Sequence, residues 1–285
     1  MSQSENCPLL EKMRRIEAIK ITKAVAELVR QASFFLRKDV LSALIKSYTA
    51  EKNRQAKSIL KAILDNAAYA RKHKLAICQD TGLPVVFIQI GQDVSVRGDL
   101  KAAVNRGIDE GYRKYYLRNS IVGDPLQRGK PGFSPCIMHT DIVKGNKIKL
   151  TLLPKGFGCE NKSQLRMFKP TASIEEIKEF IIKAVKEAGH DACPPYVVGV
   201  GIGGTADYAG LMAKKALLRK IASGSSNLEK DLLKRINKTG IGPMGLGGMN
   251  TALAVHIQTH PTHIAGLPVS VNISCHALRS ASVIL

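Results

Sequence analysis

The sequence predicts an α+β protein, with a helical N-terminal section at residues 1–74 followed by a mixed α/β region at 75–285. Up to about residue 74, apolar residues recur every three or four positions, which is the periodicity of amphipathic helices. From Leu75 onward, short apolar runs typical of strands are interleaved with helical stretches. Because these runs do not follow a regular βαβ repeat, the pattern favours α+β over a doubly wound sheet.

Helices are expected at residues 8–35, 40–49, 51–73, 100–118, 174–188 and 205–222. Asp39 stands where an N-cap would open the second of these helices. Ser173 and Glu176 have the spacing of a capping box, and Gly189 follows the last apolar residue of the same helix. The helix at 174–188 therefore carries the strongest local signal in the chain.

Strands are expected at residues 83–90, 93–96, 136–143, 147–153, 196–201 and 267–274. The third and fourth of these runs are separated by Lys144-Gly145-Asn146, a turn sequence that predicts a hairpin. Residues 250–258 fit either a strand or a helix.

The chain of 285 residues has 43 Lys and Arg against 23 Asp and Glu, a net charge of +20. Such a balance attracts anions: nucleic acid, an acidic partner or an acidic substrate. The alternative is a solvated basic surface without a specific partner. No apolar run reaches the 18 residues of a membrane span, and the N-terminus lacks a signal-peptide core, so we expect a cytoplasmic protein. Nucleic-acid recognition motifs are absent, and neither nucleic acid nor a membrane is expected as a partner.

Three of the six cysteines stand in similar settings, beside Gly, Pro or His and next to a strand-like run. They are Cys78 in Cys-Gln-Asp-Thr-Gly, Cys193 in Ala-Cys-Pro-Pro-Tyr and Cys275 in Ile-Ser-Cys-His-Ala. Thiolates bind the irons of iron–sulfur clusters, and three protein ligands leave one iron of a four-iron cluster open for chemistry. The alternative is three small buried side chains, a common environment for cysteine.

The remaining cysteines are Cys7, Cys136 and Cys159, and each lacks part of this setting. Cys159 is the hardest of them to exclude, because it also lies in a turn, Gly-Phe-Gly-Cys-Glu-Asn. In a reducing compartment, six widely and irregularly spaced cysteines indicate thiols or metal ligands rather than disulfides.

Two glycine strings match the pattern G-x-G-x-x-G: Gly199-Gly201-Gly204 and Gly240-Gly242-Gly245. The first follows an expected strand and opens an expected helix, as in a dinucleotide site, but the acidic strand end that should follow is missing. Both strings are interpreted as backbone N–H nests able to hold an anion or cluster sulfides, with simple tight turns as the alternative.

Histidines and one arginine complete the candidate set. His263 lies twelve residues before the last cysteine, and a histidine beside a carboxylate such as Asp80 can relay protons near neutral pH. Arg118 follows an expected helix, where a guanidinium can bind a carboxylate with two hydrogen bonds. Other candidate histidines are His139, His256, His260 and His276.

Five motifs in order resemble the α subunit of the class I, iron–sulfur fumarate hydratase/L-tartrate dehydratase family. They are CQDTG at Cys78, GFGCEN at Gly156, CPPYVVGVGIGGT at Cys193, GIGPMGLGGMNTALAVHI at Gly240 and LPVSVNISCHALR at Leu267. The likeness runs from about residue 10 to the C-terminus, and five ordered motifs are far more specific than one glycine string.

The resemblance implies a [4Fe–4S] cluster held by Cys78, Cys193 and Cys275, with one iron facing the substrate. It also implies a set of side chains and backbone groups around a dicarboxylate: Gln79, Asp80, Arg118, and Gly158 or Gly156. In that family pattern His263 pairs with Asp80 in proton handling, and Arg118 is the clamp arginine forty residues after the first cysteine. Cys159 stands where relatives often have Ser, which favours a bystander.

The resemblance further implies that the remaining active-site residues come from a separate β subunit, in an α/β assembly such as α2β2. The expected activity is a hydro-lyase that hydrates fumarate to (S)-malate reversibly, with L-tartrate dehydration as the alternative. Two other classes stay open from the residues alone: a dinucleotide-dependent oxidoreductase and a basic nucleic-acid-binding protein.

Overall fold

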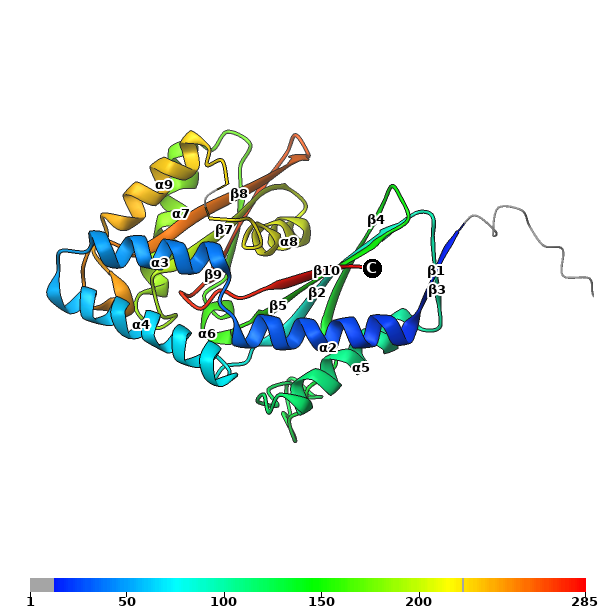
Figure 1. The fold of residues 1–285 in the computed structure, drawn as a ribbon. Coiled ribbons are helices and arrows are strands. Elements are labelled where there is room, and N and C mark those ends of the chain that lie inside the picture. Colours follow the sequence, from blue (N-terminus) through cyan, green and yellow to red (C-terminus); the bar gives the residue numbers. More distant parts are fainter. Residues whose placement is uncertain (1–12, 222) are drawn as a thin grey trace, which may run out of the picture. The chain divides into compact units, whose positions relative to one another are not determined.

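The computed structural model describes residues 13–221 and 223–285 and divides into two compact units (Figure 1). The first unit comprises Met1–Phe34, Cys78–Lys155 and Arg279–Leu285, and the second comprises Phe35–Ile77 and Gly156–Leu278. The predicted helical section at 1–74 therefore contributes helices to both units. Helices and mixed sheets together confirm the predicted α+β class.

The first unit contains β1 (Arg14–Glu17), α2 (Ala18–Phe34), β2 (Leu83–Gly91), β3 (Val94–Arg97), α5 (Leu100–Lys114), β4 (Ile137–Val143), β5 (Ile148–Lys155) and β10 (Ala281–Ile284). Its larger sheet has the order β10-β5-β2-β4, in which β2 is parallel to β4 and antiparallel to β5. A small parallel pair, β1 and β3, completes the unit. The segment that begins at Cys78 thus leads into a central strand, β2.

Helices α2 and α5 of the first unit pack together through glycines (Figure 1). A Cβ atom at Gly107 would lie 2.6 Å from the carbonyl oxygen of Thr22, and one at Gly111 would lie 2.8 Å from the Cβ of Val29. These glycines weaken α5 as an isolated helix, but they let its backbone approach α2 closely. The close approach positions the end of α5, from which the chain continues to Arg118.

Two predictions for this unit are wrong. Strands β4 and β5 do not form a hairpin, because β2 lies between them and pairs with both. Residues 14–17, expected at the start of a long helix, form β1 instead, since they pair with β3 in register. The first residues of that expected helix, 8–12, lie outside the described residues.

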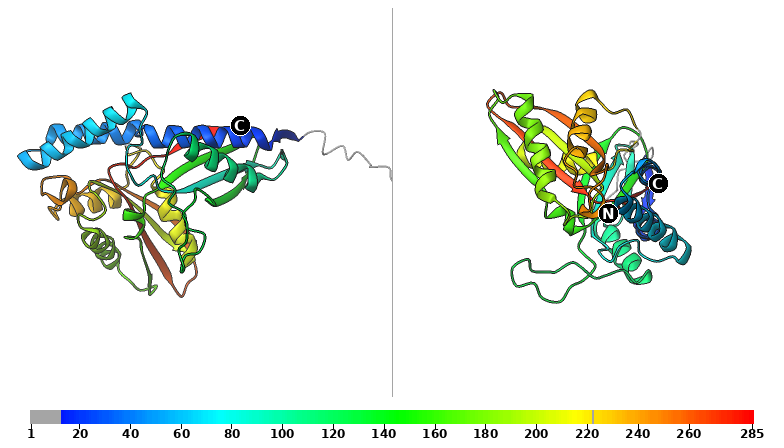
Figure 2. Two further views of the ribbon diagram at one scale, coloured as in Figure 1. Left: turned by 90° about the horizontal axis from the view of Figure 1, so that it is seen from below. Right: turned by 90° about the vertical axis from the view of Figure 1, so that its left-hand side faces the viewer.

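The second unit begins with α3 (Lys38–Ala50) and α4 (Arg54–His73) and continues with α6 (Phe157–Glu160), β6 (Gln164–Phe168), α7 (Ile174–Ala188), β7 (Tyr196–Gly204), α8 (Ala206–Ala216), α9 (Asn227–Asn237), the 3₁₀ turn η1 (Pro243–Gly245), β8 (Ala252–Thr262) and β9 (Leu267–Ser274). Its sheet has the order β6-β9-β7-β8, with β7 parallel to β8 and antiparallel to β9. Figure 2 shows the helices and strands from two further sides. The capping box at Ser173 and Glu176 is confirmed, with both hydrogen bonds formed. Asp39 is not the N-cap of α3, because it lies in the first turn and pairs with Arg37.

Strand β7 separates two helical layers in the second unit. Tyr196, Val198 and Val200 are fully buried in the core cluster that also contains the apolar faces of α7 and α9. Side chains alternate along a strand, and the opposite face of β7 presents Gly199 and Gly201 to α8. A Cβ at Gly199 would lie 2.1 Å from the carbonyl oxygen of Ala213. The first glycine string therefore serves close packing of a strand against a helix.

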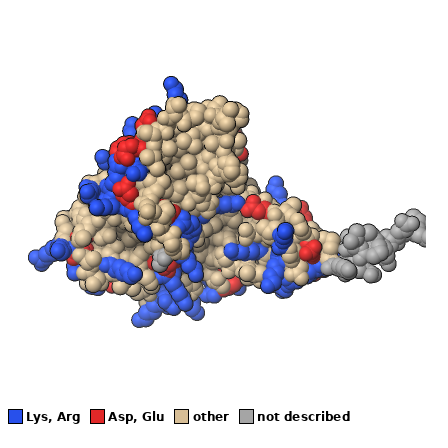
Figure 3. Space-filling model, turned by 90° about the horizontal axis from the view of Figure 1, so that it is seen from above, with Lys and Arg blue, Asp and Glu red and all other residues tan. Residues whose placement is uncertain are grey.

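Gly199 and Gly201 pair with residues of both β8 and β9. Their backbone groups belong to the sheet, so the interpretation of this string as an anion-binding nest is wrong for these two positions. Among the described residues, no helix is long and apolar enough to cross a membrane. Lys and Arg side chains are spread over much of the face drawn in Figure 3, and the acidic side chains there are fewer.

We predict that Gly201→Ala destabilises the chain by about 3 kcal/mol or more, because the new methyl group would meet backbone that cannot move aside cheaply. The Cβ would lie 2.1 Å from the carbonyl oxygen of Ala209 and 2.8 Å from the amide nitrogen of Ala213. Chemical denaturation followed by circular dichroism measures the change. Gly210→Ala is the matched control, since its Cβ meets nothing within 4 Å and alanine favours a helix. An equal loss in both variants would contradict the packing explanation.

Candidate functional site

The loop that begins at Cys78 connects α4 to β2 and has a closely defined shape. Asp80 accepts a hydrogen bond at Oδ1 from the Gly82 amide, at 3.0 Å, which closes a turn on its own side chain. Gly82 has φ +79°, and a Cβ there would lie 2.7 Å from the carbonyl carbon of Pro154. Only glycine fits this position. Cys78 is half-buried in this loop and Gln79 is exposed.

Three buried side chains fix the same loop through hydrogen bonds to backbone carbonyl oxygens. Thr81 donates from its hydroxyl to the carbonyl oxygen of Arg118 at 3.1 Å. The hydroxyl of Tyr112 lies 3.0 Å from the Thr81 carbonyl oxygen and 3.1 Å from that of Gly82. Arg279 donates from Nη2 to the carbonyl oxygen of Asp80. The loop is therefore preorganised by contacts within the first unit.

The hydrogen bond from Thr81 brings Arg118 beside the loop that carries Asp80. Arg118 follows the end of α5 and is exposed, whereas Leu117 before it is buried and anchors the turn. The structure thus unites two of the predicted substrate-binding segments within one unit. The backbone of Arg118 is thus fixed to the loop, its side chain is exposed, and an exposed guanidinium can bind a carboxylate.

Cys193 and Cys275 are joined through His276 in the second unit. Cys193 lies just before β7 with φ +57°, and Cys275 directly follows β9; both are half-buried. The His276 amide donates to the Cys193 carbonyl oxygen at 3.4 Å, and His276 Nδ1 lies 3.0 Å from the same oxygen. Because a carbonyl oxygen only accepts, Nδ1 carries the proton in this contact. His276 therefore connects the two cysteine segments.

Tyr196 at the start of β7 marks the place where the thiols of this unit gather. Its hydroxyl donates to the carbonyl oxygen of Gly189 at 2.6 Å. Burial raises the pKa of Tyr196. Tyr196 belongs to the buried core cluster that contains Cys159 and against which Cys275 packs, and Cys193 precedes it by three residues.

The predicted cluster ligands differ from the other described cysteines in solvent exposure. Cys78, Cys193 and Cys275 are half-buried, whereas Cys136 and Cys159 are 7% and 5% exposed. Burial raises the pKa of the Cys136 thiol to about 11, and Cys159 donates from Sγ to the Ala192 carbonyl oxygen at 3.3 Å. A buried thiol held as a neutral donor is a poor thiolate ligand. Cys7 lies outside the described residues.

Cys78 is tied to the second unit by its own peptide bond. Ile77, the residue before it, is buried in a small cluster with Ala70 and Ala277, and Cys275 packs against that cluster. Adjacent Cα atoms are about 3.8 Å apart, so Cys78 starts directly from the residue that packs near Cys275. Within the described part of each unit, no three Cys, His, Asp or Glu side chains are arranged to hold a metal ion. Thiolates are the ligands that iron–sulfur clusters use, and each of these three thiols is half-buried within its own unit.

The remaining predicted site residues lie in the second unit. His263 is exposed in the turn between β8 and β9, where its Nδ1 accepts from the Ala265 amide at 3.2 Å. Gly158 is exposed in the single turn α6, and amide groups in the first turn of a helix have no intrahelical acceptor. Asp80 belongs to the first unit, so the pairing of Asp80 with His263 stays a prediction.

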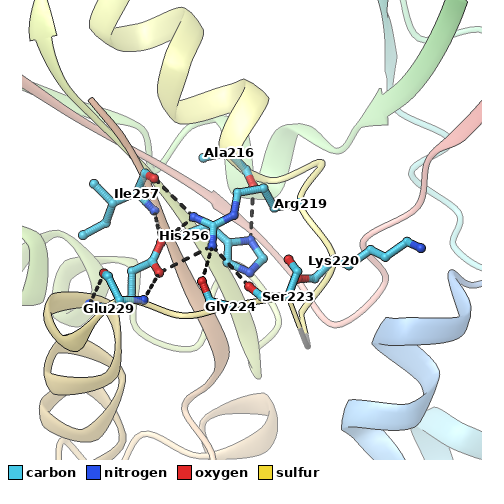
Figure 4. A network of polar contacts seen from close by, with 9 residues as sticks. Ala216, Arg219, Lys220, Ser223, Gly224, Glu229, His256 and Ile257 are labelled. Carbon is cyan, nitrogen blue, oxygen red and sulfur yellow. Dashed lines mark hydrogen bonds and ion pairs between the residues drawn. The ribbon is translucent and has the colours of Figure 1, made fainter. Parts of the chain in front are cut away.

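His256, another candidate for proton transfer, is part of a buried structural network (Figure 4). It is fully buried in β8, with Nδ1 3.1 Å from the carbonyl oxygen of Ala216, and burial lowers its pKa. Beside it, the carboxylate of Glu229 pairs with Arg219 and accepts from the Ile257 amide at 2.7 Å. This environment keeps His256 neutral and away from solvent, which is a structural role.

Sequence reasoning missed Thr81, Tyr112 and Arg279. Thr81 lies inside the CQDTG motif, but the function of its hydroxyl depends on the carbonyl of Arg118, which is remote in the chain. Tyr112 has the helical spacing of a core residue and shows no other signal. Arg279 closes the last family-like motif, and its position four residues after Cys275 was the one available signal.

The sequence matches the model of the family described as Fumarate hydratase (Fumerase) over residues 22–284. The chain belongs to this family. It is 42% identical over 276 residues to a Methanocaldococcus jannaschii protein named "Putative L(+)-tartrate dehydratase subunit alpha", covering 92% of this chain and 96% of that protein. It is 28% identical to the L(+)-tartrate dehydratase subunit alpha of Escherichia coli O157:H7, covering 93% and 91% of the two chains. Identity to the protein of the same name in E. coli strain UTI89 is 29%, with 93% and 90% covered.

We predict that His256 makes the folded chain lose stability as the pH falls through about 6.5, the ordinary histidine pKa. Because burial lowers the pKa of His256 in the folded state, the unfolded chain binds the proton first, so acid favours unfolding. Above that pH both states are neutral and the effect vanishes. Melting temperatures measured from about pH 7.5 to 5.5 should fall less in His256→Asn than in the original chain. The same substitution at exposed His260 is the control, and an unchanged slope in His256→Asn would refute the prediction.

Proposed function

We propose that this chain is the α subunit of an iron–sulfur hydro-lyase that hydrates fumarate reversibly to (S)-malate. The observation that carries the proposal is the distinction among the described cysteines: the three thiols in family-like motifs are half-buried, and the other two are buried. The first of these thiols shares a loop with Asp80 and lies in the same unit as Arg118. Membership of the fumarate hydratase family supports the reaction class.

Cys78, Cys193 and Cys275 would hold a [4Fe–4S] cluster, which supplies a Lewis-acidic iron when bound. Of the residues that the chain itself provides, Arg118 would bind one carboxylate of the substrate with two hydrogen bonds. Gln79 would orient the substrate from the same loop, and the amide of Gly158 would donate to a carboxylate oxygen.

Proton transfer in this proposal involves Asp80 and His263. Dehydration of malate removes a proton from the carbon next to the one that loses the hydroxyl group, and hydration returns it. Asp80 is held by the turn onto the Gly82 amide, so its carboxylate is fixed before substrate binds. His263 would exchange a proton with Asp80, because imidazole titrates close to neutral pH.

A β subunit is part of the proposal. The relatives at 42%, 28% and 29% identity carry the name subunit alpha, which implies a second type of chain in those proteins. We propose that the partner supplies the remaining carboxylate-binding groups and the base, in an assembly such as α2β2. The net charge of +20 would attract the fumarate dianion and an acidic partner surface.

L-Tartrate dehydration is the second candidate, and the names of the relatives favour it. Malate and L-tartrate are both four-carbon dicarboxylates with a hydroxyl group next to a carboxylate. Arg118, Asp80 and the thiols suit either one, so we expect the choice to depend on groups that contact the second hydroxyl of tartrate. A dinucleotide-dependent oxidoreductase is disfavoured, because Gly199 and Gly201 are required for the packing of β7 against α8.

We predict that Cys275→Ala abolishes the cluster and the activity, whereas Cys159→Ala keeps both. The α chain and its β partner are reconstituted anaerobically with iron and sulfide, and iron per α chain is measured together with turnover of fumarate and of L-tartrate. Removal of one thiolate ligand leaves an iron without its protein anchor, while Cys159 is already committed to the Ala192 carbonyl. Retention of cluster and turnover in Cys275→Ala would refute the ligand assignment. An original complex inactive on both substrates would refute the proposed function.

A further inference from the structure

Arg279 is almost completely buried, at 4% exposure, and contacts the backbone of the loop that carries Asp80. Its Nη2 donates to the Asp80 carbonyl oxygen, while Nε and Nη1 have no acceptor among the described residues. Arg279 opens the C-terminal segment of the first unit, four residues after Cys275. One side chain thus connects the segment that follows the third cysteine to the loop that follows the first.

The contact completes a set of hydrogen bonds along three consecutive peptide groups. The carbonyl oxygens of Thr81 and Gly82 lie within hydrogen-bonding distance of the Tyr112 hydroxyl, and the Gly82 amide donates to the Asp80 carboxylate. The Asp80 carbonyl is the one that Arg279 holds. The charge of Arg279 also acts on Tyr112, since it opposes the rise in the tyrosine pKa that burial causes. Removal of Arg279 therefore takes a side-chain donor away from the Asp80 carbonyl oxygen.

A buried guanidinium with two nitrogens that have no acceptor is unfavourable for stability, because the charge and the donors lose water without full compensation. An apolar side chain of similar length would be less costly at this position. Natural proteins keep such costly groups mainly at functional sites. The burial of Arg279 is therefore better explained by what it does to the loop than by a contribution to folding.

We propose that Arg279 is a positioning residue: it fixes the Asp80 peptide so that the side chains of Gln79 and Asp80 keep the orientation needed for the dicarboxylate. This inference rests on the proposed function and adds to it a residue outside the expected set of ligands. The planar fork of arginine sets both the direction and the distance of the donor. A lysine would keep the charge but lose that geometry.

Arg37 provides a matched control within the same chain. It is also an arginine that donates to backbone carbonyl oxygens, those of Leu217 and Arg219, at 2.9 and 2.7 Å. Its charge is compensated by Asp39, and it lies in the second unit, away from the Asp80 loop in the chain. Its removal should therefore lower stability and leave the catalytic loop unchanged.

The test compares Arg279→Lys, Arg279→Met and Arg37→Met in the reconstituted α/β complex. We measure kcat, KM, iron per α chain and melting temperature. We expect kcat per cluster to fall about tenfold in Arg279→Lys and about 100-fold in Arg279→Met, because small misplacements of catalytic groups have effects of this size. KM should change less than about threefold, and iron content should stay constant. Arg37→Met should lower the melting temperature and keep kcat per cluster.

A second measurement is made on the α chain and does not depend on enzymatic activity. Hydrogen exchange in peptides that cover residues 77–83 should be faster in both Arg279 variants and unchanged in Arg37→Met. Unaltered exchange and unaltered kcat in Arg279→Lys and Arg279→Met would overturn the inference. Loss of folding or of cluster in both variants would overturn it as well, since it would assign Arg279 a purely structural role.

The two proposals fail in different ways. If the original complex turns over neither fumarate nor L-tartrate, the proposed function is wrong, and the exchange measurement alone decides whether Arg279 fixes the loop. If the original complex is active and the Arg279 variants match it, only the role of Arg279 is wrong.

Discussion

The backbone of Asp80–Gly82 is held at every carbonyl by a buried side chain, and the candidate site depends on this constraint. Tyr112 and Arg279 hold the carbonyl oxygens, and the Asp80 carboxylate accepts from the Gly82 amide. Polar groups buried in protein must find partners, so each of these contacts removes an alternative conformation of the loop. Cys78 and Asp80 therefore keep a defined relation to each other before any ligand is bound.

In the second unit, close packing fixes a strand, β7, as hydrogen bonds fix the loop in the first unit. Strand β7 lies at the centre of its sheet, with α8 packed closely on its glycines and α7 and α9 on its other face. Cys193 lies three residues before this strand, and Cys275 directly follows its neighbour β9. His276 binds the Cys193 carbonyl and connects the two ends. The sheet thus brings the two cysteine segments together, and Cys275 packs against the core cluster that contains Tyr196.

The net charge of +20 is compatible with the small anionic substrate that we propose. The positive charge is spread along the chain and over much of the face drawn in Figure 3, and apart from residues 112–118 the sequence does not interleave aromatic with basic residues as nucleic-acid-binding surfaces do. Two arginines differ in their partners: Arg219 pairs with the carboxylate of Glu229 in the network of Figure 4, whereas Arg279 donates to the backbone carbonyl of Asp80 and its Nε and Nη1 have no acceptor among the described residues. This contrast is the basis for the positioning role that we propose for Arg279.

The sequence by itself determined the α+β class, the helix at Ile174–Ala188 and the strands at Leu83–Gly91 and Leu267–Ser274, because local periodicity and capping depend on residues close together in the chain. It also predicted the family, since five motifs keep their order. Only the tertiary structure decided that β2 separates β4 from β5, and that Gly199 and Gly201 serve packing. The roles of Thr81, Tyr112 and Arg279 likewise depend on partners 30 to 199 residues away. Such partners leave no local pattern, so burial and hydrogen bonding had to be seen in the fold.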